Sequence, residues 1–232
     1  MSVQLTVWGV HMGWHVDNRP IDGKYVAIGW PNLGDLRAYP DREAFKGALA
    51  EAGDGNAGAV PVQAGVLFRF AHEMKAGDIV VYPSKHDRMV NIGRFTGQIS
   101  YVEGDGDEYP NRRQVEWLGH YPRNDFSQAA LNEIGSALTL FRVRRHAAEF
   151  LAKVGLVSAE SAPAAVAEIA DDSADDDAAT GSVSRQAEET TADLVIRRIM
   201  ADLSGHRFDE LVAQLLECTG YTALVTARSH AA

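Results

Sequence analysis

The stretch MKAGDIVVYPSK, residues 74–85, decides the fold of the chain. Its Gly and Asp, at positions 77 and 78, are typical of a tight turn. The unbroken apolar run that follows, residues 79–83, predicts a buried strand. Ser84 and Lys85 come directly after it. The sequence therefore predicts a buried strand that delivers polar side chains to one end of a sheet.

Short apolar runs broken by Gly, Pro, Asp and Asn occur on both sides of this strand. They predict further strands at 5–10, 26–30, 91–101, 113–120 and 140–143. Helices are expected at 42–52, with Asp41 as the cap, and at 58–70, 127–133 and 147–154. Many short strands with few helices between them favour an α+β fold. We expect residues 1–157 to form a partly closed β-barrel decorated with helices.

The strand at 91–101 contains two glycines, Gly93 and Gly97. Glycine inside a strand is typical of a bulge or of a close approach by another backbone. The strand at 79–83 brings Tyr82, Ser84 and Lys85 to one end, beside the glycine-containing strand at 91–101. This arrangement predicts a small pocket.

Residues 158–190 differ in composition from the rest of the chain. They contain nine acidic residues and one basic residue, with almost no large apolar side chains, which predicts a disordered acidic linker. The net charge of the whole chain is -10, whereas residues 1–157 hold 17 basic and 18 acidic residues and are nearly neutral. The total charge therefore says little about partners of the first domain. Residues 191–232 predict two amphipathic helices and the start of a strand.

Composition also bears on location and metal binding. The chain has no run of eighteen apolar residues and no basic leader, so we expect a cytoplasmic protein without a membrane segment. The single cysteine, Cys218, excludes an internal disulfide and a cysteine-based metal cluster. His11 and His15 flank Gly13, which disfavours a helix, and Asp17 alone does not complete a metal site. No metal is expected.

Three segments, AIGWPNLGD at 27–35, MKAGDIVVYPSK at 74–85 and NIGRFTGQISY at 91–101, resemble the PUA superfamily, especially its EVE-like domains. In those domains a Gly-Asp pair precedes a strand ending in Tyr-x-Ser, and the next strand carries Ile-Gly or Val-Gly. The resemblance covers roughly residues 5–155. It implies a domain that reads modified bases in DNA or RNA.

The segment GHRFDELVAQLLECTGYTALVT, residues 205–226, resembles the opening of the Mrr-like restriction endonuclease domain. Phe208 and Asp209 stand where that family has Phe-Glu, and the helix leads through Gly220 and Tyr221 toward a strand. The resemblance implies that residues 191–232 are the helical start of a nuclease domain.

The residues that such a nuclease needs for cutting are not found in this segment. The family's catalytic Asp and its Gln-x-Lys or Glu-x-Lys would follow later, and no lysine occurs after Lys153. We therefore expect this chain to be inactive as a nuclease by itself. Mg²⁺ is expected only together with a complete nuclease domain, and no other cofactor is expected.

Base-reading pockets stack a base on aromatic faces, read its edge by hydrogen bonds and hold its phosphates with basic side chains. The candidate pocket residues are Trp8, His11, Trp30, Asp35, Tyr82, Ser84, Tyr101 and Trp117. The candidate phosphate ligands are Lys85, Arg88, Arg94, Arg112, Arg113 and Arg123.

Several candidates also have purely structural interpretations. Trp30 and Trp117 fit alternating strand patterns and would then be core residues. Asp78 is expected to close a turn through its side chain, and Asp35 would do the same. Arg112 and Arg113 would then lie on a solvated hairpin.

Two functions follow from these patterns. The first is a nucleic-acid binding module, for modified DNA above all, that flips one base into an aromatic pocket as the specificity part of a restriction or anti-phage defence endonuclease. The second is a sensor that binds a small nucleotide signal and gates an attached nuclease. A catalytic N-terminal domain would need a P-loop, a nucleophile elbow or a similar motif, and none is found. Homodimerisation, or docking with a complete nuclease domain, fits either function.

Overall fold

The computed structural model describes residues 5–53, 57–104, 108–136 and 138–157, together with residues 213–214 and 217–218. The chain divides into two units, Met1–Gln186 and Ala187–Ala232, and all the elements given below belong to the first. The expected acidic linker and nearly all of the expected nuclease fragment lie outside the described residues. Residues 213–214 and 217–218, inside the second expected helix of that fragment, are helical.

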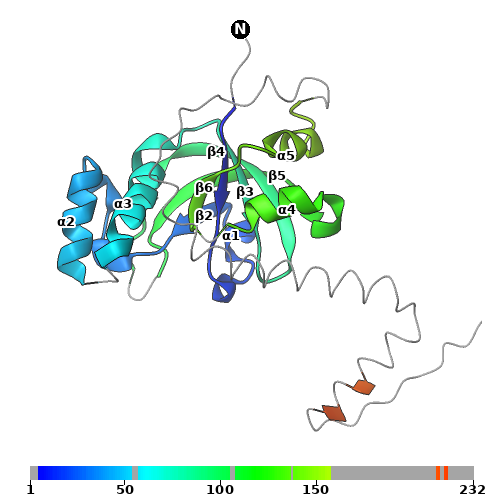
Figure 1. The fold of residues 1–232 in the computed structure, drawn as a ribbon, viewed down its shortest axis with the longest axis horizontal. Coiled ribbons are helices and arrows are strands. Elements are labelled where there is room, and N and C mark those ends of the chain that lie inside the picture. Colours follow the sequence, from blue (N-terminus) through cyan, green and yellow to red (C-terminus); the bar gives the residue numbers. More distant parts are fainter. Residues whose placement is uncertain are drawn as a thin grey trace, which may run out of the picture. The chain divides into compact units, whose positions relative to one another are not determined.

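Six strands form one mixed sheet (Figure 1). They are β1 (Val7–Val10), β2 (Tyr25–Ile28), β3 (Ile79–Pro83), β4 (Met89–Tyr101), β5 (Asn111–Pro122) and β6 (Leu140–Arg142). The order across the sheet is β2-β5-β4-β3-β1-β6, with β1 and β3 parallel and every other neighbouring pair antiparallel. The α+β class is confirmed. The expected barrel is wrong, because the sheet is open and ends in the short strands β2 and β6.

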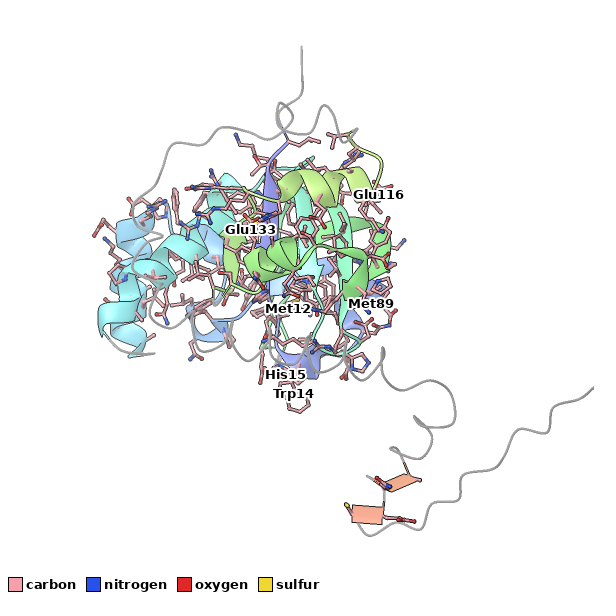
Figure 2. The ribbon with its side chains drawn as sticks, turned by 45° about the vertical axis from the view of Figure 1, so that its right-hand side comes forward. Met12, Trp14, His15, Met89, Glu116 and Glu133 are labelled. Atoms are coloured by element: carbon pink, nitrogen blue, oxygen red, sulfur yellow. The ribbon has the colours of Figure 1, made fainter. Side chains whose placement is uncertain are left out.

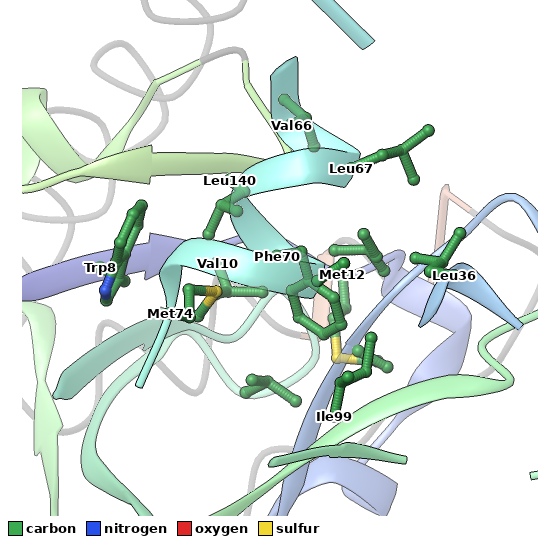
Figure 3. Packing of buried hydrophobic residues seen from close by; sticks show 14 of the residues in the cluster. Trp8, Val10, Met12, Leu36, Val66, Leu67, Phe70, Met74, Ile99 and Leu140 are labelled. Carbon is green, nitrogen blue, oxygen red and sulfur yellow. The ribbon is translucent and has the colours of Figure 1, made fainter. Parts of the chain in front are cut away.

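Strand β3 is buried on both faces, which explains its unbroken apolar sequence. Val80 and Tyr82 belong to one hydrophobic cluster, and Ile79 and Val81 belong to another. The first cluster includes side chains of α2 (Arg42–Ala52) and α3 (Val60–Phe68). The second includes side chains of α4 (Gln128–Ile134) and α5 (Ala147–Lys153). Helices therefore cover both faces of the sheet, as Figure 1 shows, and Figure 3 shows part of the first cluster from close by.

The helix ends follow local chemistry. The Asp41 side chain accepts a hydrogen bond from the Ala44 N–H at 2.9 Å, which confirms the expected cap of α2, and Gly53 ends that helix with a positive φ of 67°. The helix expected at 58–70 divides into η4 (Ala57–Ala59), α3 and a π-helical segment, η5 (Arg69–Glu73). In η5 the carbonyl oxygens of Phe70 and Ala71 accept hydrogen bonds from the Arg113 guanidinium, which stabilises this wider turn.

Several short elements lie in the connections, where sequence periodicity is too brief to predict them. They are η1 (Trp14–Val16), α1 (Arg19–Asp22), η2 (Pro31–Leu33), η3 (Leu36–Ala38) and η6 (Arg123–Asp125). Among the described helices, none has the length and apolarity required to cross a bilayer.

Candidate functional site

A hollow of about 470 Å³ lies among the connections between the strands. Its lining comes from the segments after β1, β2 and β3, from the segments before β5 and β6, and from α3. The lining residues are His11, Met12, Gly13, Gly29, Trp30, Pro31, Gln63, Lys85, Tyr109 and Thr139. Parallel strands β1 and β3 end at the same edge of the sheet, and the antiparallel β6 begins there, which explains why three of these segments meet.

The other segments reach the hollow because the sheet is strongly curved. Strands β1 and β5 are separated by β3 and β4, which in a flat sheet would keep them roughly 14 Å apart. The Gly13 N–H nevertheless donates a hydrogen bond to the Tyr109 hydroxyl at 2.9 Å. This bond connects the segment after β1 to the segment before β5 across the hollow.

Bulges between β4 and β5 accompany this curvature. The register shifts between Ile92 and Gly93 and again between Phe95 and Ile99. A Cβ atom at Gly93 would lie 2.3 Å from Val115 Cγ1 and 2.9 Å from Trp117 Cε3. The expected close approach at Gly93 is therefore confirmed, since no larger residue fits there. At Gly97 the expected bulge is present, but an added Cβ would meet nothing within 4 Å.

Trp30 supplies an aromatic wall of the hollow and has an unusual backbone. Its φ and ψ of 65° and 54° are left-handed, which is a costly conformation for a large side chain. Pro31 follows at the start of η2, and its ring fixes the backbone angle φ of that residue. The half-buried Trp30 is thus fixed at the wall of the hollow by a strained backbone, a feature that is more frequent at functional sites.

The lining includes the buried His11 and the half-buried Gln63. The His11 Nε2 lies 2.8 Å from the Ile134 carbonyl oxygen and so donates a hydrogen bond to it. Gln63, on α3, has a buried Oε1 atom for which no described residue provides a hydrogen bond. A hydrogen bond to the Gln63 Oε1 atom would therefore offset the cost of burying this acceptor.

Three of the fourteen predicted site residues line the hollow: His11, Trp30 and Lys85. Trp8 does not, because it is buried in the first cluster, where its indole N–H donates to Asp78 at 3.0 Å. Asp78 also accepts from the Lys75 N–H, in keeping with its predicted turn role.

Tyr82 and Ser84 are buried as well, at the end of β3. Burial raises the pKa of the Tyr82 phenol to about 12, although a hydrogen bond with Ser84 acts in the opposite direction. Both residues are therefore buried parts of the sheet, and neither lines the hollow.

Asp35, Tyr101 and Trp117 are the other predicted pocket residues that lie outside the lining. Asp35 accepts a hydrogen bond from the Arg37 N–H and pairs with its guanidinium at 2.6 Å, and these hydrogen bonds hold the pKa of Asp35 below its usual value. The Trp117 indole donates to the Pro20 carbonyl at 3.2 Å, and the half-buried Trp117 packs against the first cluster. Asp35 and Trp117 thus have the structural roles that the sequence also allowed.

Arg113 is a structural side chain and not a phosphate ligand, since it is fully buried. Its guanidinium donates to the carbonyl oxygens of Phe70 and Ala71, at 2.8 and 3.2 Å. Burial lowers the pKa of this group to about 10. Arg112 stacks over the Tyr25 ring at 4.4 Å. The remaining predicted phosphate ligands, Arg88, Arg94 and Arg123, are half-buried residues outside the lining.

Seven lining residues were not predicted: Met12, Gly13, Gly29, Pro31, Gln63, Tyr109 and Thr139. Gln63 lies on a helix that is distant in sequence from the strands, and no local pattern distinguishes it. Tyr109 precedes Pro110 at the entrance to a strand, a position that could have indicated a residue at the sheet edge. Within the described ranges, no group of three His, Cys, Asp or Glu side chains could hold a metal ion.

The comparison with protein-family models gives one match, to "Domain of unknown function (DUF8426)", over residues 8–144. No curated protein and no solved structure matches the chain. The matched residues run from β1 to just beyond β6 and include every residue that lines the hollow. Because the match covers more than half of the 232 residues, the chain belongs to the DUF8426 domain family.

Proposed function

We propose that residues 5–157 bind nucleic acid, modified DNA above all, and take one modified base into the hollow. In this proposal the domain is the specificity part of a restriction or anti-phage defence endonuclease. The observation that carries it is the hollow itself, which combines aromatic side chains, the half-buried amide of Gln63 and a lysine.

The size and the wall of the hollow suit a single base. Its volume of about 470 Å³ lies within the range of ~300–1,000 Å³ that is usual for small-molecule sites. Trp30 and Tyr109 bring an indole and a phenol ring to the lining from neighbouring connections, since Ile28 at the end of β2 pairs with Asn111 at the start of β5. Stacking of a base on an aromatic side chain is worth ~1–3 kcal/mol.

The polar groups of the lining suit the edge of a base. A carboxamide such as that of Gln63 carries one acceptor oxygen and two donor hydrogens, and hydrogen bonds from such a group to the edge of a base discriminate between bases by ~1–3 kcal/mol. Lys85 is exposed beside the hollow and carries a charge suited to phosphate. The likeness of residues 5–155 to EVE-like domains supports the same function.

The test is a binding titration of the full chain with fluorescently labelled oligonucleotides. These carry cytosine, 5-methylcytosine, 5-hydroxymethylcytosine, adenine or N6-methyladenine at one position. We expect one modification to bind most tightly, and Trp30→Ala to weaken that binding by roughly 10–100-fold through the loss of stacking. Tyr101→Ala is the matched control, since Tyr101 is a half-buried aromatic residue outside the hollow. Equal affinity for every oligonucleotide would refute base recognition.

Salt dependence and free nucleotides separate this function from the nucleotide sensor. Lys85→Gln is expected to weaken binding to all oligonucleotides about equally and to reduce the slope of affinity against salt by about 1. Calorimetry with free nucleotides addresses the alternative, because a sensor binds a small nucleotide tightly without a strand. Tight binding of a free nucleotide, together with no binding of any oligonucleotide, would establish the sensor instead.

A further inference from the structure

Trp14 is the most exposed large hydrophobic residue of the described chain. Its side chain is 75% exposed, whereas most of the chain's other aromatic residues that the structure describes are buried or half-buried. Figure 2 shows Trp14 at the outer limit of the domain, with its ring directed away from the ribbon, and Met12 farther in. Single exposed hydrophobic residues are common, but an indole is the largest apolar surface that a protein can leave in water.

The turn that holds Trp14 is fixed by several contacts. The preceding residue, Gly13, donates to Tyr109, and the Arg19 guanidinium donates to the carbonyl oxygens of His15 and Val16 at 3.0 and 3.1 Å. Val16 is buried in the first cluster. Because these contacts fix the backbone on both sides of Trp14, the indole is held outward by the fold.

The same turn lies beside the hollow. Gly13 belongs to the lining, and Trp14 is the next residue along the chain. His15 contacts the Tyr109 ring at 5.9 Å between centroids and pairs with Glu108 at 2.6 Å. His86, in the connection after β3 that also holds Lys85, lies 3.6 Å from Asp17. Trp14 is therefore at the rim where three connections meet.

We propose that Trp14 stacks on the base next to the one in the hollow, so that the domain reads a base within a strand. This inference rests on the proposed function and adds a second stacking surface to it. Because Trp14 follows directly on Gly13, which lines the hollow, the exposed indole lies beside the opening through which a strand would continue from a base held inside.

The charged side chains around Trp14 indicate how strongly this rim attracts phosphate. Lys85 and Arg19 are accompanied by exposed carboxylates at Asp17, Asp87 and Glu108, so the rim is not strongly basic. Attraction to phosphate is therefore not the main contribution of this rim. Stacking on the flat face of a base tolerates any base identity and depends little on salt, which makes the proposal distinguishable from a phosphate contact.

The experiment compares Trp14→Ala, Trp14→Phe and Trp30→Ala in the full chain. The ligands are single-stranded nonamers with the preferred modified base at the centre and the matching free modified nucleoside. We expect Trp14→Ala to weaken nonamer binding by about 5–100-fold, at both low and high salt, and to leave nucleoside binding unchanged. Trp14→Phe restores most of the affinity, and Trp30→Ala weakens the binding of both ligands. Thermal melting checks that each variant is folded.

Each other outcome overturns a defined part of the argument. Nonamer binding that is unaffected by Trp14→Ala but lost in Trp30→Ala overturns the role of Trp14 alone. An equal loss for nonamer and nucleoside also overturns it, because Trp14 would then belong to the pocket. A change in oligomeric state in Trp14→Ala, measured by analytical ultracentrifugation, assigns the indole to contact with a second copy instead. A wild-type chain that binds neither ligand overturns both proposals.

Discussion

Arg113 and Tyr82 are polar residues that the fold buries, and both have structural roles that their residue types do not indicate. Arg113 follows Arg112 in a sequence that is typical of a solvated hairpin, yet only Arg112 is accessible. Residues alternate between the faces of a strand, so one of two consecutive arginines necessarily points inward. The inward guanidinium is satisfied by carbonyl oxygens of the π-helical segment η5. A pattern of basic residues in a strand therefore overstates the charge available to a ligand.

Tyr82 provides a test of burial through pH. The pKa of its phenol is raised to about 12 from 10 by burial in the folded chain. Between pH 10 and 12 the unfolded chain ionises at this position while the folded chain does not, so the stability contributed by Tyr82 is lost as the pH rises. At ~1.36 kcal/mol per pH unit, the loss amounts to roughly 2–3 kcal/mol.

We expect Tyr82→Phe to lose less stability than the wild type between pH 9 and pH 12. Urea denaturation at a series of pH values measures the free energy of unfolding of both proteins. Tyr101→Phe, which removes the hydroxyl of a half-buried tyrosine, serves as the control for the loss of a phenol hydroxyl. Identical pH profiles for Tyr82→Phe and wild type would contradict the raised pKa.

At the scale of elements, substitution of the two glycines of β4 by alanine is expected to have different effects on stability. Gly93→Ala places a Cβ 2.3 Å from Val115 and 2.9 Å from the Glu116 carbonyl oxygen, which β4 cannot relieve without leaving its partner strand. We expect a loss of roughly 1–3 kcal/mol in the free energy of unfolding, as is usual for overpacking. Gly97→Ala meets nothing within 4 Å and should change stability by less than about 1 kcal/mol.

Chemical denaturation of the two glycine variants makes the comparison within one strand. Since both substitutions add the same methyl group, the difference between them reports the close approach at Gly93. Equal losses would indicate that glycine is needed in β4 for its backbone conformation and not for space.

The elements were largely predictable from the sequence, and the reasons are local. Strand β3 was predicted with its observed bounds because five apolar residues lie between a Gly-Asp turn and polar residues. The bounds of α2 were also predicted, with Asp41 as its cap. The openness of the sheet was not predictable. It depends on which strands become edges, and that arrangement is set by pairing between residues far apart in sequence.

The candidate site was less predictable than the elements. Lys85 was predicted from its place after the strand at 79–83, whereas Trp30 and His11 were predicted from the stacking and hydrogen-bonding chemistry of their side chains. Gln63 and Tyr109 reach the hollow only because the sheet is curved and α3 packs over it, and neither condition has a local sequence signal. Trp8 and Tyr82 were misassigned, since an aromatic residue near a strand end has the same pattern whether it faces core or solvent.

At the scale of the whole molecule, both hydrophobic clusters consist of residues between Leu5 and Val157. A fragment of residues 1–157 should therefore fold alone, with one cooperative transition at nearly the melting temperature of the full chain. Calorimetry of the fragment and of the full chain measures this. A melting temperature lower by more than about 5 °C would indicate that residues 158–232 stabilise the domain.

The hydrogen bond between Gly13 and Tyr109 has a thermodynamic consequence for the search for ligands. It joins connections from β1 and β5, so the hollow exists only while the curved sheet is intact. Any molecule that fills the hollow binds the folded chain and not the unfolded one, and at a hundredfold excess over its Kd it adds about 2.7 kcal/mol to the stability of the domain. The melting temperature is thus a ligand detector that requires no knowledge of the ligand, and a library of nucleosides could be ranked by it.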